Sequence, residues 1–177
     1  VPVAEARPKS AAEAHLTELC ELIAQRLDLM LGVAQAKWNR ELPITDEKRE
    51  QALLTKLAAD GKELHLPAEF VTDFFRAQIT AAKQVQEQSF QEWTAQQHPP
   101  FIDPPDLEKV VRPKIDEINR QLLVTLAKLW AERSEPDWAA AVDRATKAAF
   151  QSTAWKWNED VIATATKPLR NVAESKK

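Results

Sequence analysis

Arg26 and Lys37 are two cations whose spacing places them on one face of a single predicted helix. They lie eleven residues apart, and at about 100° per residue their side chains point within roughly 20° of each other. Apolar side chains share this face, namely Leu19, Leu22, Ile23, Met30 and Val33. Because an unpaired cation is unstable among buried apolar groups, we predict that both charges face an anionic ligand inside the protein.

Further polar residues fall on the inner faces of the next two predicted helices. Asp46, Arg49 and Glu50 lie within one turn of each other, and the carboxylates of Asp46 and Glu50 are predicted to point toward the core. Gln86 shares the apolar face of the following helix. Any one of these residues alone is better explained by a solvated face or a structural ion pair. Together they favour a polar pocket.

Local signatures of other catalytic sites do not occur in this sequence. There is no glycine-rich phosphate loop, and His15, His65 and His98 lack the spacing of metal ligands. No strand-turn-helix elbow supports a nucleophilic triad, although such a set could still assemble in space. The sequence therefore disfavours metal and nucleophilic mechanisms.

Helix-forming residues dominate the 177 positions, and only two glycines occur. This composition predicts an all-α fold, a single-domain bundle of about five to six helices. Gly61 is expected to end the second helix in a left-handed conformation, and Pro113 to kink or divide the fourth. The predicted helical stretches are 10–40, 45–61, 67–97, 106–133 and 136 onward, the last with a break near Ser152 and a charged tail after Pro168. The first, second and fourth stretches are expected to begin at N-cap residues, namely Ser10, Thr45 or Asp46, and Asp106.

Proline-rich and charged segments indicate where the helical part of the chain begins, breaks and ends. Residues 1–10 and 173–177 are predicted to be flexible tails, and the proline-rich segment 98–105 is the clearest internal break. The pieces on either side of it are too small to prefer separate cores. We therefore expect residues 11–172 to form one helical domain.

The overall charge and the apolar runs limit the partners. A net charge of −3 argues against nucleic acid or an anionic membrane as a partner. The sequence contains no run of about 18 apolar residues, so no membrane-spanning helix is predicted. Cys20 is the only cysteine and is expected to be a buried thiol. The chain begins with Val1, which is consistent with a signal peptide already removed and equally with another kind of trimming.

The order and spacing of the polar residues resemble the active site of the all-helical chorismate mutases. The matching stretches are QRLDLMLGVAQAKW, LPITDEKRE and FFRAQITAAKQVQ, and they carry Arg26, Lys37, Asp46, Arg49, Glu50 and Gln86. The similarity is closest to the exported subclass, periplasmic or secreted, in which an arginine after a proline-rich connection completes the site within one chain. The stretch VVRPKIDEIN places Arg112 at that position. The match covers about residues 16–123.

The resemblance implies the [3,3] rearrangement of chorismate to prephenate. This pericyclic reaction of a dianion needs no nucleophile, no proton transfer, no metal and no cofactor. The resemblance also implies a periplasmic or secreted homodimer with chorismate as its small-molecule substrate.

Roles for the individual residues follow from the same resemblance. It implies that Arg26 and Arg112 clamp the two substrate carboxylates and that Lys37 and Gln86 flank the ether oxygen. The second helix would then complete the site, with Arg49 adding positive potential, Glu50 accepting from the ring hydroxyl, and Asp46 fixing the helix start.

Two positions depart from parts of the family pattern. Ala82 stands where some relatives carry Ser or Thr, which removes a possible hydrogen bond near a carboxylate. Gln86 stands where some exported relatives carry Glu, and its amide donates a hydrogen bond at any ordinary pH, whereas a carboxyl group must be protonated to donate.

Two other classes of function remain open from the sequence. A catalytically inactive helical protein that binds a dicarboxylate metabolite would carry the same motif. A structural or chaperone-like protein that uses its six tryptophans as an interaction surface is less favoured, because aromatic residues at helical spacing usually belong to a core.

Overall fold

The part of the chain that the computed structural model describes, residues 8–134, 136–151 and 158–172, contains helices and no strand. A π-helical segment, Leu107–Val111, precedes α4. The α-helices are α1 (Ala11–Asn39), α2 (Glu47–Glu63), α3 (Ala68–Ala95), α4 (Arg112–Glu132), α5 (Trp138–Gln151) and α6 (Glu159–Asn171). The predicted all-α class is confirmed.

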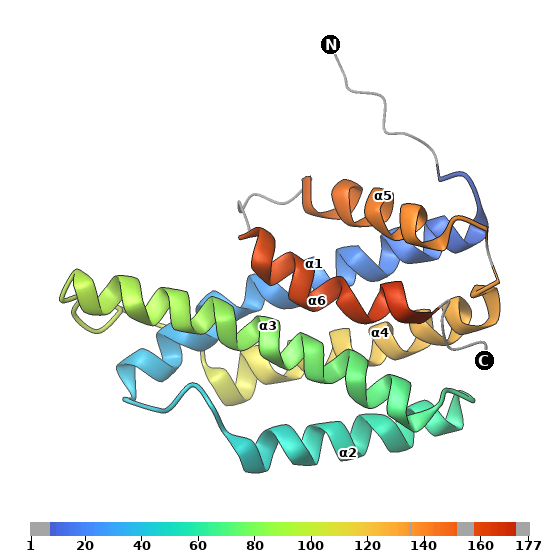
Figure 1. The fold of residues 1–177 in the computed structure, drawn as a ribbon. Helices are drawn as coiled ribbons and strands as arrows, with labels where there is room; N and C mark the ends of the chain where they lie inside the picture. Colours follow the sequence, from blue (N-terminus) through green and yellow to red (C-terminus); the bar gives the residue numbers. More distant parts are fainter. Residues whose placement is uncertain (1–7, 135, 152–157, 173–177) are drawn as a thin grey trace.

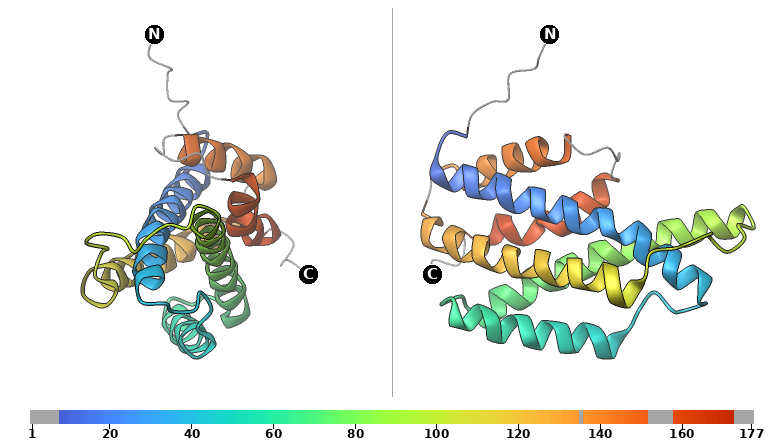
Figure 2. Two further views of the ribbon diagram at one scale, coloured as in Figure 1. Left: turned by 90° about the vertical axis from the view of Figure 1, so that its left-hand side faces the viewer. Right: turned by 180° about the vertical axis from the view of Figure 1, so that it is seen from behind.

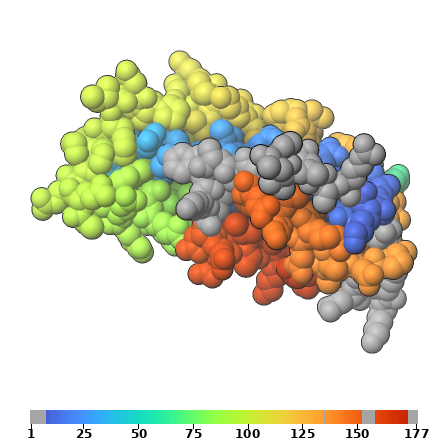
Figure 3. Space-filling view, turned by 90° about the horizontal axis from the view of Figure 1, so that it is seen from above, coloured from blue at the N-terminus to red at the C-terminus, as the bar shows by residue number. Residues whose placement is uncertain are grey.

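The helices form an elongated bundle in which α1 and α3 are central (Figure 1). Helix α1 packs against α3, α4 and α5, while α3 packs against α2 and α6. Helices α2 and α5 lie on opposite sides of the bundle, as the two further views confirm (Figure 2). Seen from above, the C-terminal part of α3 forms one end of the molecule, beyond α5 and α6 (Figure 3).

One cluster of buried apolar side chains includes residues from all six α-helices. Phe74 and Phe75 are almost fully buried in it, with their rings edge to face at 5.1 Å between centroids. Cys20 is buried in the same cluster, as predicted. Residues on both sides of the proline-rich segment 98–105 therefore contribute to shared packing.

Side-chain caps begin three of the helical segments at the predicted residues. Ser10 accepts a hydrogen bond from the backbone N–H of Glu13 at 3.1 Å, and Asp46 caps α2. Asp106 accepts from two backbone N–H groups of the π-helical segment. Such caps satisfy N–H groups that lack a partner in the first helical turn.

Pro113 and Pro168, where the sequence predicts a helix to break or end, both lie inside helices. Pro113 lies in the first turn of α4, where a missing N–H is harmless, so the predicted fourth helix is divided there. The end predicted at Pro168 is wrong, because α6 continues through it to Asn171. The predicted break at Ser152 and the tails at 1–7 and 173–177 lie outside the described residues.

The role predicted for Gly61 is also wrong. Helix α2 continues past it to Glu63, and no glycine of the described residues has a positive φ. The left-handed residue of this turn is His65, with a φ of 60°. Gly61 instead lies where α2 and α3 meet, and a Cβ there would lie 2.7 Å from Cγ2 of Val71. Its small size allows the close approach of the two helices.

Gly61→Ala should therefore destabilise the protein by about 1 kcal/mol. Alanine gains about 1 kcal/mol of helix propensity, but overpacking against the fully buried Val71 costs about 1 to 3 kcal/mol. Urea denaturation measures the change. In a Val71→Ala background the same substitution should be stabilising, because the overlapping methyl group is gone. A stabilised single variant would contradict this account of Gly61.

Candidate active site

All seven residues predicted for the site line one cleft. The cleft has a volume of about 570 Å³ and lies between α1, α2, α3, the beginning of α4 and the loop before α2. The predicted residues in its lining are Arg26, Lys37, Asp46, Arg49, Glu50, Gln86 and Arg112. Residues 86 positions apart in the sequence thus reach one site within a single chain.

Arg26 reaches this cleft from the middle of α1 and is only 4% exposed. Its Nε donates to Oδ1 of Asn119 on α4 at 3.1 Å, and its Nη1 donates to the backbone carbonyl of Gln78 on α3 at the same distance. Burial lowers the pKa of Arg26 to about 10. No ion pair joins this guanidinium to a carboxylate of the described residues. The charge is therefore available to an anion in the cleft.

Lys37 is half-buried near the end of the same helix. Its Nζ donates to the backbone carbonyl of Ile44 at 2.6 Å, which fixes the ammonium group beside the loop that leads into α2. Burial lowers the pKa of Lys37, an effect that the nearby carboxylates of Asp46 and Glu50 oppose. The ammonium retains two further N–H donors for a ligand.

The first turn of α2 supplies three charged side chains in different environments. The prediction that the Asp46 carboxylate points to the core is wrong: Asp46 is exposed, and its side chain accepts from the backbone N–H of Arg49 at 3.1 Å. A residue at the N-cap bonds back to the helix rather than inward. Arg49 is exposed at the cleft rim. Glu50 is half-buried, and its Oε2 lies 3.2 Å from Nζ of Lys83 on α3.

Gln86 is 4% exposed in α3 and faces the same cleft. Its Nε2 donates to the backbone carbonyl of Ala82 at 3.2 Å and contacts Sδ of Met30 at 3.8 Å. Its Oε1 is buried without a hydrogen-bond partner. One hydrogen bond within α3 thus sets the orientation of the Gln86 amide. The amide lies beside α1 and lines the cleft, where it can contact a ligand.

Arg112 enters from the first residue of α4 and is half-buried. Its Nη1 contacts the carboxylate of Glu108, one turn earlier in the chain. Because Glu108 is largely exposed, this pair is the kind of solvent-accessible contact that a ligand carboxylate can displace.

Three residues of the site were missed by sequence reasoning. Lys83 lines the cleft, while Asn119 and Gln78 hold Arg26 from outside it. Each carries a detectable signal, because Lys83 precedes Gln86 by three residues, Gln78 follows Phe74 by four, and Asn119 precedes Leu122 by three. A polar side chain at such a core-facing spacing needs a partner.

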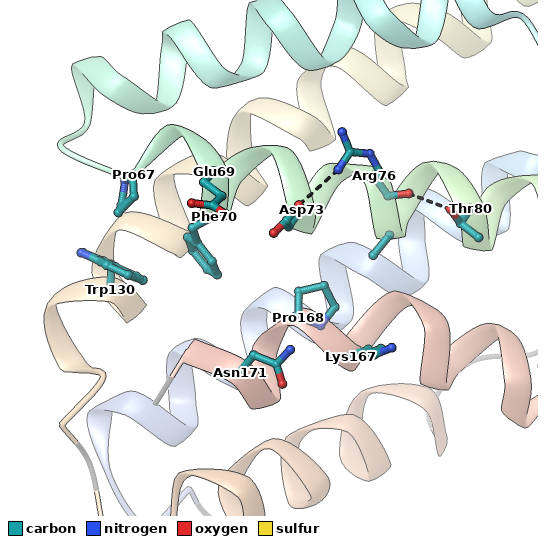
Figure 4. A pocket seen from close by; sticks show the side chains of 11 residues that line it. Pro67, Glu69, Phe70, Asp73, Arg76, Thr80, Trp130, Lys167, Pro168 and Asn171 are labelled. Atoms are coloured by element: carbon teal, nitrogen blue, oxygen red, sulfur yellow. Dashed lines mark hydrogen bonds and ion pairs between the residues drawn. The ribbon is translucent and has the colours of Figure 1, made fainter. Parts of the chain in front are cut away.

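A larger cavity, of about 710 Å³, contains none of the predicted site residues (Figure 4). It lies between the first half of α3, the end of α4 and α6, and is lined in part by Phe70, Trp130 and Pro168. The charges around it include an exposed pair between Arg76 and Asp73. Volume alone therefore does not identify the functional site of this protein.

The arrangement of donors defines the class of site. Five cationic side chains line the cleft, including Lys83, and no Ser, Cys or His of the described residues does so. Ammonium, amide and guanidinium donors face one partly buried space, as in a site that binds a compact anion and stabilises charge by preorganised hydrogen bonds. The helices of the described residues thus enclose a cleft of the type that binds anions, with the groups needed for electrostatic catalysis.

Comparisons with known proteins identify the family. The model of the chorismate mutase type II family matches residues 17–87. The secreted chorismate mutase of Mycobacterium tuberculosis is 32% identical over 146 residues, covering 82% of this chain and 73% of that protein. The chain belongs to the chorismate mutase type II family.

Solved structures agree with this assignment. The crystal structure of a chorismate mutase from Burkholderia thailandensis is 33% identical, with a TM-score of 0.79, and covers 88% of this chain and 99% of that chain. A chorismate mutase from Burkholderia phymatum is 26% identical with a TM-score of 0.81, covering 90% and 98%. The expected chorismate mutase fold is therefore confirmed.

No helix in the described ranges is both long enough and apolar enough to cross a bilayer.

Lys83→Met should raise KM about fivefold with a smaller effect on kcat. The substitution removes one cation from a cleft that receives a dianion, and it breaks the ion pair between Lys83 and Glu50. Steady-state kinetics measure the change. Lys56→Met is the matched control, because Lys56 forms an exposed pair with Asp60 on α2, outside the cleft. An equal effect of both substitutions would show that total charge, and not the Lys83 position, is responsible.

Proposed function

We propose that the cleft of a single chain converts chorismate to prephenate through electrostatic preorganisation by the seven predicted residues. The observation that carries this proposal is the buried guanidinium of Arg26, which has neutral hydrogen-bond acceptors and no carboxylate partner in the described residues. Such a charge is suited to the carboxylate of a bound ligand. The other donors of the cleft then match the remaining features of this dianion.

Arg26 and Arg112 bind the two substrate carboxylates. A guanidinium group forms paired, charge-assisted hydrogen bonds with a carboxylate. The two arginines come from different helices, α1 and α4, so together they hold the flexible ether side chain close to the ring. Restricting chorismate to its compact, reactive conformer removes part of the entropic barrier. On binding, a substrate carboxylate replaces Glu108 as the partner of Arg112.

Lys37 and Gln86 donate hydrogen bonds to the ether oxygen. Negative charge grows on this oxygen as its bond to the ring carbon breaks, so donors directed at it bind the transition state more tightly than the substrate. Each donor of this kind contributes roughly 3 to 4 kcal/mol to lowering a barrier. The bond from Lys37 to the Ile44 carbonyl and that from Gln86 to the Ala82 carbonyl orient the two groups in advance.

The remaining residues bind the ring and shape the potential. Glu50 accepts a hydrogen bond from the ring hydroxyl, Arg49 adds positive potential at the rim, and Asp46 fixes the start of α2 through its cap. Ala82 offers no hydroxyl, so a water molecule completes the hydrogen bonds of the neighbouring carboxylate.

The wider organisation is part of the same proposal. Residues 11–172 act as one domain, the protein is exported to the periplasm or secreted, and two chains associate as a homodimer. Export is supported by the relative from Mycobacterium tuberculosis, which is named a secreted chorismate mutase. Because the cleft is lined within one chain, activity per chain should not depend on dilution of the dimer.

The first test is the loss of the ultraviolet absorbance of chorismate with purified protein, a chelator and no added cofactor. We expect rapid loss, and a reduction of at least 100-fold in kcat for Lys37→Ala, the effect of removing about 3 kcal/mol of transition-state stabilisation. Lys56→Ala serves as the charge control. Binding of chorismate by calorimetry without turnover would instead identify an inactive relative that only binds the metabolite.

Gln86→Glu should make activity dependent on pH. A carboxyl group donates to the ether oxygen only while it is protonated, and burial in this position raises its pKa above the usual value near 4.3. Activity of the variant should therefore be highest at low pH and fall as pH rises through that pKa, whereas the amide of the wild type keeps donating. The test is a profile of kcat from about pH 4.5 to about pH 8, the range over which the protein is expected to stay folded. A pH-independent variant would contradict the role of Gln86.

A further inference from the structure

Asn119 is the side chain that holds the buried guanidinium of the cleft. It lies on α4 and is 1% exposed, and its Oδ1 accepts from Nε of Arg26 at 3.1 Å. The backbone carbonyl of Gln78, a residue that is itself fully buried, accepts from Nη1. Both acceptors are neutral, so they orient the guanidinium without cancelling its charge.

The amide of Asn119 is not the choice that stability alone would favour. Its Nδ2 group is buried without a hydrogen-bond partner, and a buried donor left unpaired is destabilising. Aspartate has nearly the same shape and carries no such donor. It would also give Arg26 a buried counter-ion. An uncompensated internal charge beside an unpaired amide therefore indicates selection for something other than stability.

The hydrogen-bond directions explain what the amide provides. With Nε bound to Asn119 and one N–H of Nη1 bound to Gln78, three of the five guanidinium N–H groups remain. Arg26 also lines the cleft, so these donors can bind an anion there. Asn119 lies seven residues after Arg112 on the same helix, so α4 carries one arginine of the cleft and orients the other.

We propose that Asn119 is a positioning residue that orients Arg26 toward the substrate carboxylate while leaving the positive charge of Arg26 uncompensated. This inference rests on the proposed function, in which Arg26 binds that carboxylate. It adds the requirement that the residue at position 119 be a neutral acceptor. A carboxylate at this position occupies the guanidinium as an internal ion pair and competes with the substrate.

The test is Asn119→Asp, with Asn158→Asp as the matched control. Asn158 caps α6 through Oδ1, which accepts from the backbone N–H of Asp160 at 2.8 Å, and aspartate caps equally well. Both variants therefore change the net charge by the same amount. We expect Asn119→Asp to raise KM at least tenfold, with a smaller change in kcat and a Tm equal to or higher than that of the wild type. The affinity for prephenate, measured by calorimetry, should fall in parallel, and the control should match the wild type.

Asn119→Ser separates orientation from charge. Its shorter side chain does not reach Nε, so KM should again rise while the protein remains neutral at this position. This variant also decides the question if Asn119→Asp does not fold. Wild-type KM in a folded Asn119→Asp, or in a folded Asn119→Ser, would overturn the inference.

The proposed function fails separately. If the wild type binds chorismate without turnover, the function proposed here is wrong. The role of Asn119 is then decided by whether Asn119→Asp weakens that binding at least tenfold.

Discussion

The buried positive charge of Arg26 is the constraint on which the arrangement of this protein depends. A guanidinium that is 4% exposed needs hydrogen-bond acceptors to hold it, and no single neighbouring helix supplies both of those present. Helix α4 provides Asn119 and α3 provides the carbonyl of Gln78. The side chain of Gln78 in turn donates to the carbonyl of Ala165 on α6 at 2.7 Å. Four helices are thus connected through one cation and its neighbours.

The two halves of α1 have different tasks as a result. The first half packs on α5, where Arg144 binds the carboxylate of Glu13 through two hydrogen bonds and lowers its pKa. Cys20 is buried there too, and burial raises its pKa to about 12, so this thiol is inert at neutral pH. The second half carries Arg26 and Lys37 to the cleft. Stability and chemistry are therefore separated along one continuous helix.

Sequence alone reached those parts of the site that helical periodicity controls. The inward direction of Arg26 and Gln86 and the caps at Ser10 and Asp46 follow from spacing within one helix, and the structure confirms them. Features that depend on a second helix were missed or wrong. Gly61 was expected to end α2, yet its small size serves the contact with Val71 on α3. The sequence spacing is enough to recognise Asn119 as a polar residue on a buried helix face. It does not reveal that the partner of Asn119 is Arg26 on α1.

Because Arg26 and Lys37 share one helix, the helix itself sets the spacing and relative direction of these two cations. Eleven residues advance about 16 Å along the axis and complete just over three turns. Adding or deleting one residue between them would turn Lys37 by about 100° and move it out of the cleft. The part of α1 between Arg26 and Lys37 therefore tolerates substitution but not a change of length.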